Sequence, residues 1–366
     1  MVEKYELRLH AEYAHLLADL IKEPPELTSS SLNVILRGVV GDPVFARVKE
    51  LDRKLREAGR AGVFAGWDIR RTFSREEIER AELFLLRIGF THVAGEEYGT
   101  EYEESSDCLQ QAWRHEFLDH SGAKFRTVPE MVPCGICSKR VGVLQVPFSK
   151  LAKKRDLFRI WGGELIVSER LAALLREGGF TGGELLPVRN IRPESTRPMD
   201  LSVCPAGVEL LSLAAAKGVN LNPKKQEFWW WLYEDAPKAL LNEMLEQQKA
   251  LRIKPARSSR SYSQLVLHSR PLEVSERTRF GDRLLDTDVR KVHCKSGEIA
   301  GGSLLSPLSV VGDSWDGSDL CRTRVYIIRR QGLFRPHQPL VVSKRLFTAM
   351  QQSGMKGFRY EVAETT

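Results

Sequence analysis

Two cysteines separated by two residues form the clearest site-forming pattern in the chain. They are Cys134 and Cys137, with Gly135 and Ile136 between them. Two thiolates at this spacing form a knuckle that supplies two of the four ligands of a tetrahedral zinc ion. We therefore expect one bound zinc ion, with Cys134 and Cys137 among its ligands.

The other ligands have to come from the segment before this knuckle. Cys108 lies there, but Gln111 stands three residues on, where a second cysteine pair would have its second thiolate. His115 and His120 both carry an imidazole that could complete the tetrahedron. The predicted metal ligands are Cys108, His115, Cys134 and Cys137.

Two other interpretations of this segment stay open. One is a degenerate ribbon whose fold survives without metal, because the fourth ligand is not evident. The other is a thioredoxin-type redox pair, which requires the CxxC at the start of a helix after a strand. The residues after Cys137 instead have the pattern of a turn followed by a strand. Among the other cysteines, Cys294 stands alone, and Cys204 and Cys321 are expected to be small buried residues.

A seven-residue pattern occurs twice and marks an internal repeat. Leu165-Ile-Val-Ser-Glu-Arg-Leu171 matches Leu340-Val-Val-Ser-Lys-Arg-Leu346. Each copy predicts a short apolar strand followed by a helix, with Ser168 or Ser343 as the N-cap. Glycine then ends each helix at Gly178-Gly179 and Gly354, and a second strand returns at 185–188 and 358–362. Upstream, Leu157-Phe158-Arg159 aligns with Leu333-Phe334-Arg335 after a one-residue gap.

The polar residues of the two repeats favour a structural role. Ser168, Arg170, Ser343 and Arg345 are explained by helix capping and by ion pairs at the surface. An active site on each repeat would require an acid–base partner at a fixed spacing, and the sequence contains none.

Five further segments have helical patterns. Apolar residues recur at helical spacing in Glu12–Lys22 and Pro43–Glu57. Ser74 with Glu77 forms a capping box, and the helix behind it is expected to continue to about Ile88. Val208–Ala216 and Glu227–Leu251 are also helical in pattern, with interruptions at proline.

These elements predict an α+β fold. We expect two related strand–helix–strand modules with short antiparallel strands, joined by a helical middle segment. The predicted domains are residues 1–190, with the partial zinc-ribbon-like module and the first repeat, a tryptophan-rich helical connector at 191–262, and a β-rich domain at 263–366 with the second repeat.

The composition limits the class of protein. Hydrophobic residues make up 42% of the 366 residues and charged residues 28%, which excludes a wholly disordered chain. The longest apolar runs are far shorter than the roughly 20 residues of a membrane span, and Met1–His10 lacks the apolar core of a secretory signal. We expect a cytoplasmic protein without a membrane partner. Its net charge of +7 is compatible with an anionic partner.

Three consecutive tryptophans, Trp229, Trp230 and Trp231, form a second candidate site. Consecutive side chains on a helix cannot all face the same side, so at least one of them should contact something other than the local core. Large aromatic residues often carry the binding energy of protein interfaces. We therefore predict that this run contacts a partner protein.

The cysteine pair and the two repeats together resemble the bacterial family of double-CXXCG-motif immunity proteins. Ser138 stands where that motif has its glycine, and the second motif is reduced to Cys294. The resemblance implies a cytoplasmic, non-enzymatic protein that neutralises a cognate toxin by direct binding. The resembling segments are Cys134–Cys137, Asp156–Arg159, Leu165–Gly182, Trp315–Gly317 and Leu340–Gly357.

Nucleic-acid binding is the alternative function. Lys139-Arg140, Lys150–Arg155 and Arg252–Arg260 are basic, and the tryptophan run offers faces on which bases stack. Such a chain would be an accessory protein with a zinc-ribbon-like module. The sequence contains no phosphate-binding glycine loop and no GxSxG nucleophile motif, and we expect no enzymatic activity.

Overall fold

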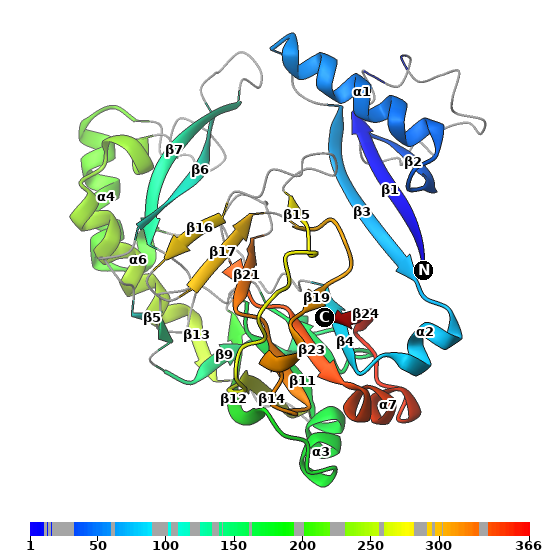
Figure 1. Cartoon of the computed structure of the whole chain (residues 1–366). Helices are drawn as coiled ribbons and strands as arrows, with labels where there is room; N and C mark the ends of the chain where they lie inside the picture. Colours follow the sequence, from blue (N-terminus) through cyan, green and yellow to red (C-terminus); the bar gives the residue numbers. More distant parts are fainter. Residues whose placement is uncertain are drawn as a thin grey trace.

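The structure, a computed structural model, has helices packed on several separate sheets, which confirms the expected α+β class (Figure 1). It describes residues 1–10, 13, 16, 33–59, 63–89, 102–103, 109–117, 125–133, 139–140, 142–160, 163–193, 201–219, 231–255, 260–281, 291–294, 297–301, 303–328 and 336–366. In this described part of the chain, no helix is long and apolar enough to cross a membrane.

The N-terminal part is a three-stranded antiparallel sheet covered by one helix. Its strands lie in the order β2-β1-β3, and α1 (Pro43–Glu57) has the bounds expected from the sequence. Tyr5, Leu7 and Leu9 on β1 are buried together with Val48 of α1, because alternate residues of a strand face the same side. The expected helix at Glu12–Lys22 falls almost entirely outside the described residues. The strands are β1 (Val2–His10), β2 (Asn33–Val39) and β3 (Phe64–Thr72).

The capping box at Ser74 is confirmed, but the helix behind it is much shorter than expected. Helix α2 covers only Arg75–Arg80, and the chain then forms strand β4 (Leu83–Ile88). Residues 83–86 are all buried, with alternate side chains in two different hydrophobic clusters. A short apolar run that is buried on both faces has no periodicity of its own, so its sequence pattern does not separate strand from helix.

Each repeat forms a sheet with a helix between two parallel strands, and the predicted strand–helix–strand modules are present. The second repeat has the same order of elements as the first, and the two modules are related by this shared topology. The first contains β9 (Leu144–Val146), β10 (Leu157–Arg159), β11 (Leu165–Ser168), α3 (Glu169–Glu177) and β12 (Gly183–Pro193). The second contains β19 (Ser309–Val310), β20 (Leu320–Arg322), β23 (Leu340–Ser343), α7 (Lys344–Gln352) and β24 (Phe358–Thr365).

The upstream alignment of the two repeats was wrong. The counterpart of Leu157-Phe158-Arg159 is Leu320-Cys321-Arg322 rather than Leu333-Phe334-Arg335, because β10 pairs with β11 as β20 pairs with β23. Five residues connect the two strands in the first repeat, at 160–164, whereas the second repeat carries a longer connection at 323–339. The difference in residue number between equivalent positions of the two repeats is therefore constant through the helices, but it changes for the strands before this connection.

Each module is completed by a strand that precedes the other module in the chain. Strand β14 (Tyr262–Leu267) lies between β11 and β12, and β4 lies between β23 and β24. The registers agree, because Leu265 pairs with Leu165 and Leu185 just as Leu86 pairs with Leu340 and Tyr360. The sheet pairing thus crosses the expected boundary between residues 1–190 and 263–366, and that domain division stays a prediction.

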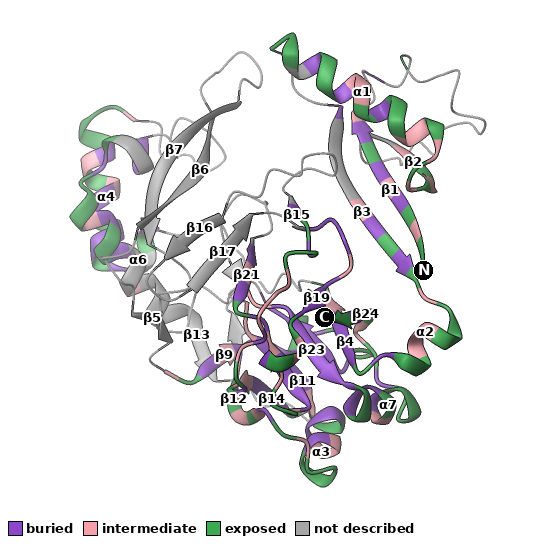
Figure 2. Ribbon diagram, viewed as in Figure 1, coloured by how far each residue is buried: buried purple, intermediate pink, exposed green. Residues whose placement is uncertain are grey.

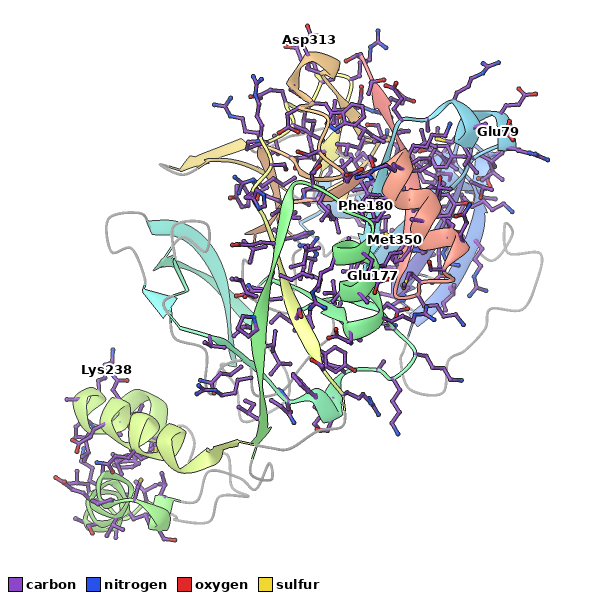
Figure 3. All side chains as sticks on the ribbon, turned by 90° about the horizontal axis from the view of Figure 1, so that it is seen from below. Glu79, Glu177, Phe180, Lys238, Asp313 and Met350 are labelled. Atoms are coloured by element: carbon purple, nitrogen blue, oxygen red, sulfur yellow. The ribbon has the colours of Figure 1, made fainter. Side chains whose placement is uncertain are left out.

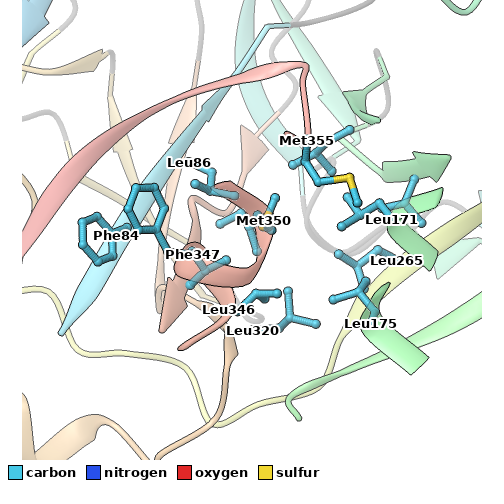
Figure 4. Close-up of a cluster of buried hydrophobic side chains, with 14 of the residues drawn as sticks. Phe84, Leu86, Leu171, Leu175, Leu265, Leu320, Leu346, Phe347, Met350 and Met355 are labelled. Carbon is cyan, nitrogen blue, oxygen red and sulfur yellow. The ribbon is translucent and has the colours of Figure 1, made fainter. Parts of the chain in front are cut away.

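The two modules share one hydrophobic core. Helices α3 and α7 lie side by side, and the cluster between them joins Leu171 and Leu175 with Leu346 and Met350 (Figures 3 and 4). At one end of this cluster the rings of Phe84 and Phe347 stack, with centroids 3.9 Å apart. Figure 2 shows the buried residues concentrated in these central strands and in the faces of the helices toward them.

A helical pair forms the middle segment that was expected between the repeats. Helix α4 (Pro205–Ala216) packs against α6 (Lys238–Arg252), and the pair lies apart from the two modules (Figure 3). Strand β13 (Ile253–Pro255) then pairs with the end of β12 and leads the chain back to the first module.

The remaining described strands belong to the long connections of the two modules. β5 pairs with β8, β6 with β7, and β15 with β18, while β16, β17, β21 and β22 form a four-stranded sheet. They cover β5 (Tyr102–Glu103), β6 (Leu109–Phe117), β7 (Phe125–Pro133), β8 (Lys139–Arg140), β15 (Phe280–Gly281), β16 (Lys291–Cys294), β17 (Gly297–Gly301), β18 (Ser303–Leu304), β21 (Val325–Ile328) and β22 (Pro336–His337).

Two equivalent glycines allow each module to approach the other closely. Gly182 follows α3 with a φ of +92°, and a Cβ atom there would overlap the carbonyl oxygen of Leu320. Gly357 follows α7 with a φ of +113°, and its Cβ would overlap the carbonyl oxygen of Leu157. Backbone contact at both places requires a residue without a side chain.

Replacing Gly182 by Ala should destabilise the fold by about 2–4 kcal/mol, because the new methyl group adds steric overlap to a strained backbone conformation. Gly179→Ala is the matched control: Gly179 also has a positive φ, of +56°, but its Cβ would meet nothing within 4 Å. That variant should lose only about 1 kcal/mol. Denaturant unfolding of both variants measures the difference, and equal losses would contradict the close approach.

Candidate functional site

The predicted polar residues of the two repeats form equivalent clusters around a buried aspartate. In the first, the Ser168 hydroxyl donates to Asp156 Oδ1 (2.8 Å) and accepts from the backbone N–H of Leu171 (3.3 Å). In the second, the Ser343 hydroxyl donates to Asp319 Oδ1 (2.6 Å) and accepts from Leu346 N–H (3.2 Å). The expected N-caps are confirmed. The aspartates were not predicted, although each stands immediately before the leucine of an equivalent strand.

Each cluster extends across to the other module. Arg170 donates to Asp156 Oδ2 (3.0 Å) and to the carbonyl oxygen of Gly354 behind α7 (2.8 Å). In the opposite direction, Arg345 binds Asp319 and donates to the carbonyl oxygen of Gly179 behind α3 (3.1 Å). Each arginine thus satisfies carbonyl groups at the end of the partner helix, where helices leave free acceptors.

The aspartates also accept from the partner module's backbone. Asp319 Oδ2 accepts from Thr181 N–H (3.0 Å), and Asp156 Oδ2 accepts from Lys356 N–H (2.8 Å). Burial disfavours the charged form of Asp319, but the hydrogen bonds from Arg345, Ser343 and Thr181 outweigh it and lower its pKa to about 2. So weak a base is poorly suited to activating the Ser343 hydroxyl, and capping and pairing account for these residues.

Of the four predicted zinc ligands, only His115 belongs to a described strand. Cys108, Cys134 and Cys137 are outside the described residues, but the hairpin of β6 and β7 pairs Leu109 with Pro133. These two residues directly follow Cys108 and directly precede Cys134 in the sequence.

His115 is also on this hairpin, where it pairs with Thr127. It stands six positions after Leu109 on this extended strand, which amounts to about 20 Å. A zinc ion binds its ligands at about 2.0–2.3 Å. Cys108 itself lies outside the described residues, so the ligand set of Cys108, His115, Cys134 and Cys137 stays a prediction.

The cysteine-bearing segments occupy equivalent places in the two modules. The first is the connection from β4 to β9, residues 89–143, which contains Cys134 and Cys137. The second is the connection from β14 to β19, residues 268–308, which contains Cys294 at the end of β16. Because β4 and β14 correspond, as do β9 and β19, both segments are insertions at one topological position.

The tryptophan run is divided by the structure. Trp231 begins a short π-helical turn (Trp231–Asp235) and is only 5% exposed, in the cluster between α4 and α6. In this structure Trp231 is thus a core residue and does not form part of an exposed partner-binding surface. Trp229 and Trp230 lie outside the described residues, and their contact with a partner stays a prediction.

Cys204 and Cys321 are both buried and free, as expected from the sequence. The Cys321 thiol donates to the carbonyl oxygen of Ser318 (3.1 Å), and burial raises its pKa to about 12. A thiol held in its neutral form is a poor nucleophile and a poor metal ligand, so the structure assigns Cys321 to the core.

A basic cavity of about 520 Å³ was not predicted from the sequence. Strands β3, β4 and β24 contribute to its walls, which are in part apolar. Arg159 on β10 lines it and is only 3% exposed. No sequence motif marks this cavity, since its charged residues come from distant parts of the chain: Asp68, Arg87, Arg155, Arg159 and Arg359.

A chain of ion pairs beside this cavity joins the N-terminal sheet to the second module. The buried Arg71 guanidinium donates to Glu3 (2.7 Å) and to Glu361 (3.0 Å), and Arg87 donates to Glu361 (2.9 Å). Removing one partner would leave an uncompensated buried charge, so this chain fixes how β3 lies against β24.

Comparison with models of protein families, with curated proteins and with solved structures finds no match to this chain.

Asp319→Asn should destabilise the protein by about 1–2 kcal/mol near neutral pH, after allowance for solvent screening. The folded-state pKa of Asp319 lies below the unfolded value. Its contribution is therefore complete above about pH 4 and is lost as the pH falls toward about 2. Urea unfolding at about pH 7 and about pH 3 measures it. Asp313→Asn is the control, because Asp313 is exposed. The difference between the unfolding free energies of the two variants should be smaller at about pH 3 than at about pH 7. A difference of constant size would contradict this role.

Proposed function

We propose that the chain is a non-enzymatic binding protein, a cytoplasmic immunity protein of a bacterium that neutralises a cognate toxin by direct binding. The observation that carries this proposal is the equivalent placement of the two cysteine-bearing insertions, 89–143 and 268–308. A double cysteine motif that arose with a duplicated module is expected to occupy one topological position twice, as these insertions do.

The two modules suit a binding role because the core that they share contains no residue of either insertion. Leu272, Phe280, Leu304 and Leu308 of the second insertion are buried in a separate cluster, on the other side of β4. Each central sheet is completed by β4 or β14, and the helices α3 and α7 cover it. A rigid scaffold of this kind leaves its connecting segments free to vary and to carry recognition residues. The insertions and the tryptophan run before α6 are therefore the proposed contact regions.

Trp229 and Trp230 are the proposed aromatic anchors of this interface. The buried Trp231 ties the end of the run to the core between α4 and α6. Aromatic residues next to such an attachment lose little further conformational freedom on binding, and tryptophan is enriched among residues that dominate interface energetics.

The cysteine pair of the first insertion is proposed to hold one zinc ion. Cys134 and Cys137 supply two thiolates, and Cys108 precedes Leu109, which pairs with the residue before Cys134. In the second insertion only Cys294 remains, with Lys295, Ser296 and Gly297 after it, and we propose no metal there. The zinc would stabilise the first insertion, as structural zinc sites do.

Elemental analysis of the purified protein should find about one zinc per chain. Cys134→Ser should lose the metal and lower the thermal midpoint, because metal binding contributes to folding of the segment. Cys204→Ala is the matched control: it removes a thiol that lies in the core between α4 and α6, and it should keep the zinc. Folded wild-type protein with less than about a tenth of this zinc content would refute the site.

Co-expression with the toxin should test the binding role directly. We expect the chain to restore growth of cells that express a toxic product encoded beside it, and a Trp229→Ala, Trp230→Ala double variant to lose most of this protection. Arg75→Ala, whose side chain is 91% exposed on α2, is the surface control. Circular dichroism establishes that each variant is folded. The immunity function would be ruled out if the chain protected cells against none of the products encoded beside it.

A further inference from the structure

The basic cavity beside β4 is large enough for a small organic molecule. Its volume of about 520 Å³ lies within the range of roughly 300–1,000 Å³ that is usual for small-molecule sites. Leu85, Ile88 and Phe358 give it apolar wall area, while arginines from three separate segments line it. Such a mixture suits a ligand with one charged group and one apolar part.

Most charges around the cavity are already balanced by partners. Glu3 and Glu361 together compensate Arg71 and Arg87, as the ion-pair chain described above shows. Arg359 pairs with Asp68 at 3.0 Å. Of these residues, Asp68, Arg87 and Arg359 line the cavity, and with their partners they contribute no excess charge to it.

Two arginines that line the cavity have no carboxylate partner in the part of the chain that the structure describes. Arg159 is buried and donates only to backbone carbonyls, from Nη1 to Gly163 (3.0 Å) and from Nη2 to Gln338 (3.2 Å). Arg155 is exposed and forms no ion pair there. The cavity therefore carries an excess of two positive charges, one of which is withdrawn from water.

Burying the Arg159 guanidinium without a counter-ion costs free energy, and a bound anion would offset this cost. Burial lowers the pKa of its guanidinium to about 10, so the group still carries its charge at neutral pH. A buried charge without a counter-ion is costly, and the two carbonyls compensate it only in part. Guanidinium groups also bind phosphate and carboxylate oxygens through several N–H donors at once.

We propose that this cavity binds a small phosphate monoester, whose phosphate lies between Arg155 and Arg159 and whose organic part lies against the apolar wall of β4 and β24. A phosphate monoester carries a charge of about −1.5 to −2 at neutral pH, which matches the excess of two cations. A monocarboxylate would neutralise only one of them. This site is independent of the proposed immunity function.

Calorimetric titration with phenyl phosphate, inorganic phosphate, benzoate and phthalate tests the proposal. We expect phenyl phosphate to bind with a defined stoichiometry of one, to raise the thermal midpoint, and to bind more tightly than benzoate. Inorganic phosphate should bind less tightly than phenyl phosphate if the apolar wall takes part. Phthalate carries two carboxylates. Comparing its affinity with that of phenyl phosphate shows whether two negative charges are sufficient or a phosphate group is required.

Two variants connect the binding to the named side chains. Arg155→Ala and Arg159→Lys should each weaken phenyl phosphate at least about 10-fold, because each removes charge-assisted hydrogen bonds. Arg176→Ala is the control, since Arg176 pairs with Glu169 on α3 and does not line the cavity. Because Arg159 also binds two carbonyls, Arg155→Ala keeps the test valid if the Arg159 variant fails to fold.

Three results would overturn the proposal. The first is wild-type protein that binds no phenyl phosphate. The second is equal affinity for benzoate or phthalate, which would assign the cavity to carboxylates. The third is an equal loss of affinity in Arg155→Ala and Arg176→Ala, which would mean nonspecific attraction to a basic surface.

Discussion

Each module leaves a gap in its own sheet, between the strand before its helix and the parallel strand after it. The missing antiparallel strand comes from the segment that precedes the other module: β14 enters between β11 and β12, and β4 between β23 and β24. Because an unfilled gap would leave two rows of backbone N–H and carbonyl groups without partners, neither sheet is complete without the other half of the chain. This exchange is the constraint on which the rest of the structure depends.

The polar contacts between the modules follow from that exchange. Once β4 and β14 are in place, α3 and α7 share one core. The loop behind α3 then meets β20, and the loop behind α7 meets β10. Asp156 and Asp319 accept hydrogen bonds from both modules there, while Arg170 and Arg345 bind carbonyl groups at the partner helix end. The absence of a side chain at Gly182 and Gly357 permits the approach. These residues determine how the two modules pack against each other. Equivalent residues make the same contacts in both directions.

The exchange also explains where long insertions can lie. Closed sheets tolerate long insertions, and both cysteine-bearing connections leave the scaffold between equivalent strands. The basic cavity arises for a related reason, because β3, β4, β10 and β24 meet at the seam between the N-terminal sheet and the modules. Figure 1 shows β4 and β24 close together near the C-terminus, although they are distant in the sequence. A site at such a seam has no local motif.

The sequence by itself determined the elements whose information is local. The caps at Ser74, Ser168 and Ser343, the glycine that ends each repeat helix, the bounds of α1 and the α+β class all follow from neighbouring residues. The tertiary structure decided what depends on long-range contact. Leu83–Leu86 form a strand because apolar side chains bury both of its faces, and Leu320–Arg322 correspond to Leu157–Arg159 because of sheet pairing. Arg159 lines a cavity because distant strands surround it. Local patterns encode caps and turns, whereas burial and pairing arise only when distant segments meet.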